Sequence, residues 1–283
     1  MHQGTSNYRT IVTLVLSLFL FAGCASEPKQ CPRDPIKIAQ DLPCMEVEPR
    51  KQPIRYLILH HTAASLPSSM QILQGKSETK KVGIHYLVCN QPRPQVYRFA
   101  PEHLATSHAG KSAWRQDQSL NQSSVGIEIV NLDGNLYPYP PSQIAQIIAL
   151  CQEIIIRYKI DPTHVLAHSD ISIGRKKDPG SLFPWKELAE AGIGAWPDEV
   201  DVQKFQTLYA KKLPDKKEIV GQLIDYGYRP FDSSEMSMKI TIEAFQRHFR
   251  GKKVDGEIDV ETAAMVSALH TKYCQAQPST AKN

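Results

Sequence analysis

The sequence predicts an α/β domain followed by a smaller all-helical domain, and two observations carry this prediction. In the first two-thirds of the chain, short apolar runs typical of buried strands accompany one long amphipathic helical pattern. After Trp196 and Pro197 the pattern changes, and three short helical patterns follow. The chain has 283 residues, a length that suggests about two domains.

Four short runs before residue 132 have the composition of strands. They are RYLILH (55–60), HYLVC (85–89), QVYRF (95–99) and SVGIEIVN (124–131). A loop with two prolines separates the second run from the third, so we expect these two strands to be adjacent. In the fourth run Val125, Ile127 and Ile129 alternate, which predicts that Glu128 points to the opposite face of the strand.

Residues 143–159 predict a helix, because apolar residues recur there at i, i+3 and i+4. Ser142 is the predicted N-cap, and Asp161-Pro162 ends the helix. Cys151 lies on the apolar face and is expected to be a core residue. The next run, HVLAH (164–168), predicts a short strand that ends at His168.

The remaining C-terminal part divides into a linker, a helical domain and a tail. Residues 198–217 are rich in Lys and Asp and are interpreted as a linker with some helical character. Residues 218–273 contain helical patterns at 218–228, 238–251 and 259–273, and residues 274–283 are expected to be disordered. The α/β domain is therefore assigned to residues 50–197.

The first 49 residues are expected to lie outside the folded domains. Arg9 precedes an apolar run of eleven residues (11–21), which is too short to span a bilayer and has the length of a signal-peptide core. The residues AGC (22–24) resemble a bacterial lipobox, which implies a signal peptide over 1–23 and lipidation of Cys24. The alternative is cleavage elsewhere, with Cys24 incidental. Residues 24–49 are interpreted as a tether.

By resemblance to lipoprotein sorting, Ser26 implies an outer-membrane lipoprotein that faces the periplasm. Such a protein is anchored to the membrane without spanning it. Cys31 and Cys44 flank a Pro-rich stretch and are a candidate disulfide in an oxidising compartment. The formal net charge of +4 is too small to indicate nucleic-acid binding, and no dense basic run with interleaved aromatic residues occurs.

His60, His168 and Asp178 form a candidate metal-binding set. A catalytic zinc commonly has three protein ligands from histidine and carboxylate and keeps a fourth position for water. His60 and His168 both end strand-like runs, and Asp178 follows His168 by ten residues across a Gly-containing loop. Since the chain has ten histidines, this spacing alone is only moderately specific.

Other side chains fit the same chemistry. Glu128 is an acid within an apolar strand, a costly position unless the acid is functional or paired, and it is a candidate base for a water molecule. Pairing with an arginine or with the backbone is the structural alternative. Lys176 and Lys177 precede Asp178 and are candidates to stabilise an oxyanion, the alternative being solvated loop charges.

Five motifs occur in the order seen in type 2 N-acetylmuramoyl-L-alanine amidases, the zinc amidases related to peptidoglycan recognition proteins. The motifs, which span residues 58–180, are ILHHT (58–62), HYLV (85–88), SHAG (107–110), VGIEI (125–129) and HSDISIGRKKDPG (168–180). The chain resembles this family most in its periplasmic lipoprotein members. The resemblance implies a mixed central β-sheet flanked by helices and one zinc ion.

The resemblance also implies roles for individual residues. His60 rather than His61, together with His168 and Asp178, matches the zinc ligands. Glu128 matches the general base, and Lys176 matches the oxyanion stabiliser. His85 and Asp170 are expected to be structural, whereas His108 and Arg175 are expected to contact substrate.

The C-terminal patterns resemble a three-helix peptidoglycan-binding domain in LIDYGY (223–228), AFQRHF (244–249) and VDGEID (254–259). Together, the resemblances imply hydrolysis of the amide between N-acetylmuramic acid and L-alanine in peptidoglycan and muropeptides. The alternative is a recognition protein on the same fold that binds peptidoglycan without cleaving it. The complete set of metal ligands favours the enzyme.

Overall fold

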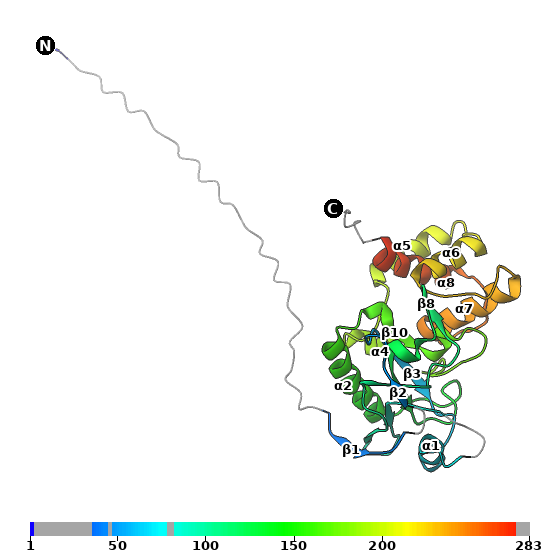
Figure 1. Ribbon diagram of the computed structural model, residues 1–283. Coiled ribbons are helices and arrows are strands. Elements are labelled where there is room, and N and C mark those ends of the chain that lie inside the picture. The colour runs from blue at the N-terminus through cyan, green and yellow to red at the C-terminus, as the bar shows by residue number, and fades with distance from the viewer. Residues whose placement is uncertain (3–35, 45–46, 78–81, 276–283) are drawn as a thin grey trace. The chain divides into compact units, whose positions relative to one another are not determined.

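The computed structural model describes residues 1–2, 36–44, 47–77 and 82–275 (Figure 1). Residues 3–23 of the predicted signal peptide, Cys24 and Cys31 lie outside the described residues. From residue 36 onward the described residues belong to one compact unit. Within these residues no helix has the length and apolar character needed to cross a membrane.

A six-stranded mixed sheet forms the centre of this unit and confirms the predicted fold class. Its order is β1 (Ile38–Asp41), β5 (Val96–Arg98), β4 (Tyr86–Val88), β9 (Ser124–Ile129), β3 (Tyr56–His61) and β10 (Val165–Ala167). The pair β4–β5 is antiparallel and the other neighbours are parallel. The strands predicted at 55–60, 85–89, 95–99, 124–131 and 164–168 are all present, and β4 and β5 are adjacent as expected.

Two strands lie within the segment interpreted as a tether, residues 24–49. Strand β1 joins the sheet edge, and β2 (Val47–Pro49) pairs with β6 (Leu104–Thr106). Nearly all of their residues are exposed, so no apolar alternation marked them in the sequence. A further small hairpin consists of β7 (Ala113–Trp114) and β8 (Asp117–Gln118).

One face of the sheet packs against helix α2 (Pro141–Tyr158), which confirms the predicted helix and the buried position of Cys151. The predicted N-cap is wrong, because Pro140 occupies that position and the helix begins at Pro141. A proline fits the first helical turn, where its missing N–H has no partner to lose. Short helices complete this part of the chain: α1 (Leu66–Leu73), α3 (His168–Ile171), α4 (Trp185–Glu190), η1 (Leu120–Ser123) and η2 (Pro162–His164).

The helical segment, residues 199–275, contains α5 (Glu199–Tyr209), α6 (Lys216–Tyr226), α7 (Glu235–Phe249) and α8 (Val260–His270), followed by a π-helical turn (Thr271–Gln275). The three predicted C-terminal helices are therefore confirmed. Helix α5 lies in the predicted linker and packs along α8. The domain boundaries stay predictions.

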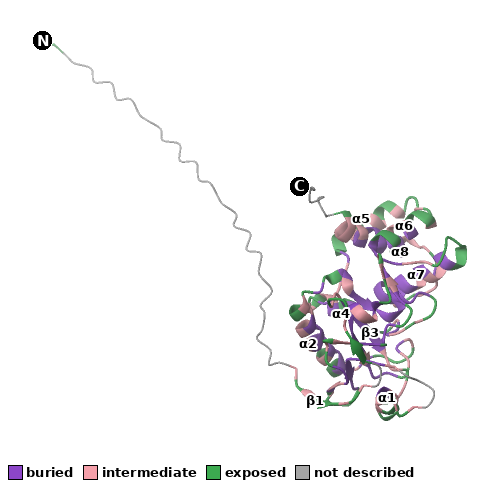
Figure 2. Ribbon diagram, in the orientation of Figure 1, coloured by how far each residue is buried: buried purple, intermediate pink, exposed green. Residues whose placement is uncertain are grey.

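The helical segment and the sheet share one hydrophobic cluster. Tyr56 and Ile58 from β3 belong to the same buried cluster as Phe245 from α7 and Leu269 from α8. Figure 2 shows buried residues in the sheet and along α7. Burial of apolar surface is the main favourable contribution to folding, so the helical segment stabilises the sheet that it covers.

Candidate active site

The candidate site lies where three parallel strands end. In the register of β3 and β9, His60 is the partner of Glu128, so both side chains project from the same face of the sheet. Strand β10 ends with Ala167 beside Leu59, which places the next residue, His168, close to His60. Strand ends therefore bring together three residues that are far apart in sequence.

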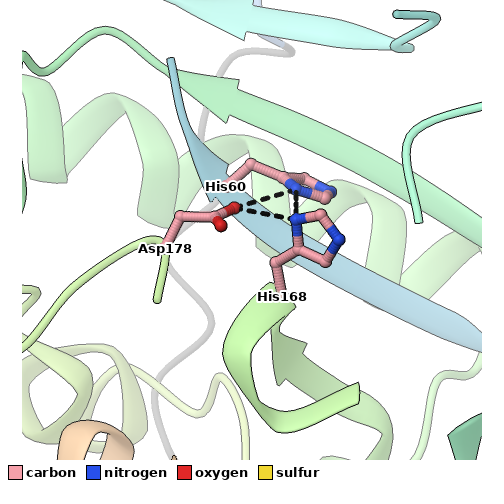
Figure 3. Close-up of side chains that lie close together, drawn as sticks. All are labelled: His60, His168 and Asp178. Atoms are coloured by element: carbon pink, nitrogen blue, oxygen red, sulfur yellow. Dashed lines mark hydrogen bonds and ion pairs between the residues drawn. The ribbon is translucent and has the colours of Figure 1, made fainter. Parts of the chain in front are cut away.

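His60, His168 and Asp178 direct their ligand atoms at one another (Figure 3). The two Nδ1 atoms of the histidines are 2.9 Å apart, and Asp178 Oδ2 lies 3.2 Å from His60 Nδ1 and 2.9 Å from His168 Nδ1. Both histidines are buried, whereas the Asp178 side chain is 12% exposed. Two imidazoles and one carboxylate are the donor set of a catalytic zinc site with an open position, so the residues present fit this metal.

Outer hydrogen bonds fix which nitrogen of each ring faces the metal position. Ser124 Oγ donates to Leu120 O at 2.6 Å, so it accepts from His108 Nε2 at 3.1 Å. His108 Nδ1 then accepts from His60 Nε2 at 3.0 Å, and the lone pair of His60 is left on Nδ1. In the same way, His168 Nε2 donates to Ala109 O at 3.3 Å. Such outer partners orient metal-binding imidazoles.

Burial favours the neutral form of His60, the form that binds a metal, and of its partner His108. It lowers the pKa of His60 to about 4, with the neighbouring His168 as the second cause. Burial also lowers the pKa of His108 well below its usual value.

Gly126 makes room for the ring of His108. A Cβ atom at residue 126 would lie 2.4 Å from His108 Nδ1, much closer than a non-bonded contact allows. His108 lines the pocket, but both its ring nitrogens are engaged within the protein. The contact between His108 and substrate stays a prediction, and the structure shows His108 holding His60.

Glu128 has a carboxylate oxygen without a partner. Its Oε2 is shielded from solvent and accepts no hydrogen bond from the described residues, so the pairing with arginine or backbone considered above is not found there. Burial, followed by the negative charge of Asp178, raises the pKa of Glu128 to about 8, and Lys176 opposes this change. A carboxylate with a shielded, unpartnered oxygen beside a candidate metal site suits proton transfer.

A cavity of about 530 Å³ opens over these residues. Its lining includes the three candidate ligands together with Glu128, His108, Arg175 and Lys176. Arg175 Nη2 donates to Lys111 O and Ser172 Oγ, both at 2.6 Å. The structure therefore brings all the predicted site residues from 60 to 178 to one cavity, while contact of Arg175 with substrate stays a prediction.

His85 and Asp170 lie outside the ligand cluster, as expected. His85 is buried and accepts from Gly126 N at 3.0 Å. Asp170 is the centre of a buried hydrogen-bonded cluster with Tyr228 and His248. No pattern in the sequence identifies these two partners, because they lie 58 and 78 residues from Asp170 and follow no spacing rule.

Comparison with known proteins gives consistent results for sequence and structure. A family model described as N-acetylmuramoyl-L-alanine amidase matches residues 50–181. The N-acetylmuramoyl-L-alanine amidase AmiD of Escherichia coli K12 is 38% identical, over 94% of this chain and 99% of its own. This likeness includes the helical segment.

Two solved structures with bound ligands also resemble the chain. One is the E. coli AmiD complex with the substrate anhydro-N-acetylmuramic acid-L-Ala-D-gamma-Glu-L-Lys, at 38% identity and a TM-score of 0.70, covering 81% of this chain and 93% of that one. The other is AmpDh3 of Pseudomonas aeruginosa with anhydromuramic pentapeptide. It has 35% identity and a TM-score of 0.73, and the match covers 79% of this chain and 93% of that one.

Proposed function

This chain belongs to the N-acetylmuramoyl-L-alanine amidase family, and we propose that it is a zinc enzyme that cleaves the amide between N-acetylmuramic acid and L-alanine in peptidoglycan and its fragments. The observation that carries the proposal is the convergence of His60, His168 and Asp178 beside the unpartnered carboxylate of Glu128. Zinc held by the three ligands would supply Lewis-acid chemistry at its open position.

Glu128 is the proposed general base. A base must be ionised before it accepts a proton, and a cation held by the three ligands would lower the pKa of Glu128 from about 8 towards neutrality. A pKa near the working pH is the most effective for proton transfer. Glu128 would take a proton from the attacking water and pass it to the leaving amine of L-alanine.

Lys176 is the proposed oxyanion stabiliser. Its side chain lines the same cavity as Glu128, on the loop that leads to Asp178. A fixed positive charge is most effective where negative charge develops during the reaction, here on the carbonyl oxygen of the scissile amide. Lys176 and Glu128 thus have opposite tasks on the two reacting groups.

The test is incubation of the purified protein with muropeptides, with and without a chelator, followed by mass spectrometry. We expect free stem peptide, and its loss on chelation with recovery on adding zinc. Intact muropeptides after incubation with the zinc-loaded protein would contradict the enzyme and favour peptidoglycan recognition without cleavage.

We further propose that the protein is an outer-membrane lipoprotein anchored through Cys24 and facing the periplasm. The proposal is supported by the apolar run at 11–21 and the AGC sequence at 22–24. The test is fractionation of cells that express the full chain or C24A, with mass spectrometry of the mature N-terminus. Unmodified protein cleaved at another site would contradict the anchor.

The helical segment is proposed to bind peptidoglycan and so to raise the local concentration of substrate. Its support is the resemblance of residues 218–273 to peptidoglycan-binding domains. The test is cosedimentation of full-length E128Q protein with insoluble peptidoglycan while soluble muropeptide saturates the active-site cavity. Complete loss of cosedimentation under these conditions would leave the cavity as the sole binding site and contradict the proposal.

A further inference from the structure

A buried hydrogen-bonded cluster joins the helical segment to the part of the chain that carries the metal ligands. Its centre is Asp170, which lies in helix α3 and is 0% exposed. Asp170 Oδ1 accepts from the Tyr228 hydroxyl at 2.9 Å, and Oδ2 lies 2.7 Å from His248 Nδ1. Tyr228 and His248 are also buried and both belong to the helical segment. The contact between the two parts of the chain therefore lies at Asp170, two positions along the sequence from the candidate ligand His168.

Asp170 organises its own helix as well. Its Oδ2 accepts from Ala167 N at 2.8 Å and so closes the first turn of α3, which begins with His168. Ser169, which lies between His168 and Asp170, donates its backbone N–H to Asp178 O at 3.0 Å. Two of the three candidate ligands therefore depend on the position of one four-residue helix.

The partners of Asp170 are held in fixed orientations. The ring of His248 stacks on Trp185 with centroids 3.8 Å apart and on Phe249 at 4.2 Å. Tyr228 packs edge-on against Trp114 at 5.0 Å. Because the Asp170 carboxylate is the acceptor, His248 presents its Nδ1 proton to it.

We propose that the helical segment is a positioning element of the metal site, in which Tyr228 and His248 hold the Asp170 carboxylate and Asp170 holds His168 in its metal-binding orientation. This inference rests on the proposed zinc site. Removing one of the three donors to the buried Asp170 carboxylate leaves part of its charge without compensation, so α3 would shift to regain contacts. Tyr228, His248 and Asp170 touch neither the reacting atoms nor the metal position, so they act through His168.

The test measures zinc affinity of the full-length protein by competition with a chromophoric chelator, together with the visible spectrum of the cobalt-loaded protein. In H248F the aromatic ring keeps its stacking on Trp185 but loses the proton donor, and we expect zinc binding about tenfold weaker. In H248N the amide nitrogen can take the place of Nδ1, and we expect most of the affinity and the wild-type cobalt spectrum to return.

A matched control lies elsewhere in the same segment. His270 Nε2 pairs with the exposed Asp225 at 3.2 Å, so H270F also removes a histidine–aspartate pair and should leave zinc affinity unchanged. Circular dichroism confirms that each variant is folded. Should H248F fail to fold, Y228F removes only one hydroxyl and one hydrogen bond, and we expect its zinc affinity to fall about threefold.

The outcomes separate this inference from the proposed function. A wild-type protein that binds no zinc would overturn the zinc site and this inference together. Folded H248F with wild-type zinc affinity, or unchanged affinity in Y228F, would overturn the inference alone. Equal losses in H248F and H248N would also overturn it, because they would show that the hydrogen bond is not what positions His168.

Discussion

The cavity around Glu128 and the interface around Asp170 each contain an acid with a carboxylate oxygen shielded from solvent, but their surroundings differ. Asp170 accepts hydrogen bonds from Tyr228, His248 and Ala167 N. Glu128 Oε2 has no such partner among the described residues. A buried acid whose oxygens are all engaged is suited to hold structure, whereas an unpartnered one retains the capacity to accept a proton. The number of donors around an acid thus separates the two roles more clearly than its burial does.

Substitution of Glu128 should give the largest effect. E128Q keeps the size of the side chain and leaves the three metal ligands in place, but it removes the proton acceptor. We expect zinc binding to persist and turnover of muropeptides to fall by about 10²–10⁴-fold. Stem-peptide release and bound zinc are measured on the same sample. E190Q, at an exposed glutamate of α4, is the control, and near-normal turnover in E128Q would remove Glu128 from its proposed role.

Substitution of Lys176, whose charge is opposite to that of Glu128 in the same cavity, should give the second-largest effect. K176M should reduce turnover by about 10²-fold through weaker stabilisation of the oxyanion, with little change in zinc affinity. The adjacent Lys177 is exposed and does not line the cavity, so K177M is a matched control. Equal loss of turnover in both variants would mean that the charge of the loop matters rather than the position of Lys176.

Substitution of Asp170 should lower the stability of the folded protein. D170N keeps the shape but replaces an acceptor oxygen with a donor, and we expect the free energy of unfolding to fall by about 1–3 kcal/mol. Urea unfolding of the metal-free protein measures this loss. D225N, at the exposed partner of His270, should cost under about 0.5 kcal/mol. A fully stable D170N protein would contradict the structural assignment of Asp170.

The smallest expected effect is a pH dependence in the metal-free protein. The pKa of Glu128 is raised to about 8 in the folded state, so folding favours its protonated form. The contribution of this raised pKa to the free energy of unfolding is fully present below the usual pKa of glutamate, about 4.3. It is lost as the pH rises through 8. Because the side chain is partly exposed to the cavity, we expect the wild type to lose only about 1 kcal/mol relative to E128Q between pH 6.5 and pH 8.5. Parallel stability curves for the two proteins over this range would contradict the raised pKa.

Local patterns in the sequence predicted most of the sheet and the position of the site. Alternating apolar residues located β9 and indicated that Glu128 points to the face opposite Val125, Ile127 and Ile129. The apolar runs of β3 and β10 located His60 and His168. Choosing Asp178 rather than Asp170 as the third ligand required the resemblance to a known family, because both acids follow His168 closely.

Features without a local pattern were not predicted. Strands β1 and β2 are mostly exposed and lack alternation, since pairing with neighbouring strands holds them in place and Ile38 is their one partly buried residue. The partners of Asp170 are set by how α7 and the segment before it meet α3, a tertiary contact that no periodicity encodes. The same applies to the fit of His108 against Gly126, which depends on the meeting of a loop with a strand.

The hydrophobic cluster that the sheet and the helical segment share limits the exchange of such segments between enzymes. A wall-binding module on a flexible linker can be exchanged between enzymes without altering the chemistry. Here an exchange of the helical segment would also remove Tyr228, His248 and the apolar side chains that share a buried cluster with Tyr56 and Ile58. A chimera would have to keep the partners of Asp170 as well as the apolar contacts, so the two segments have to be engineered as one unit.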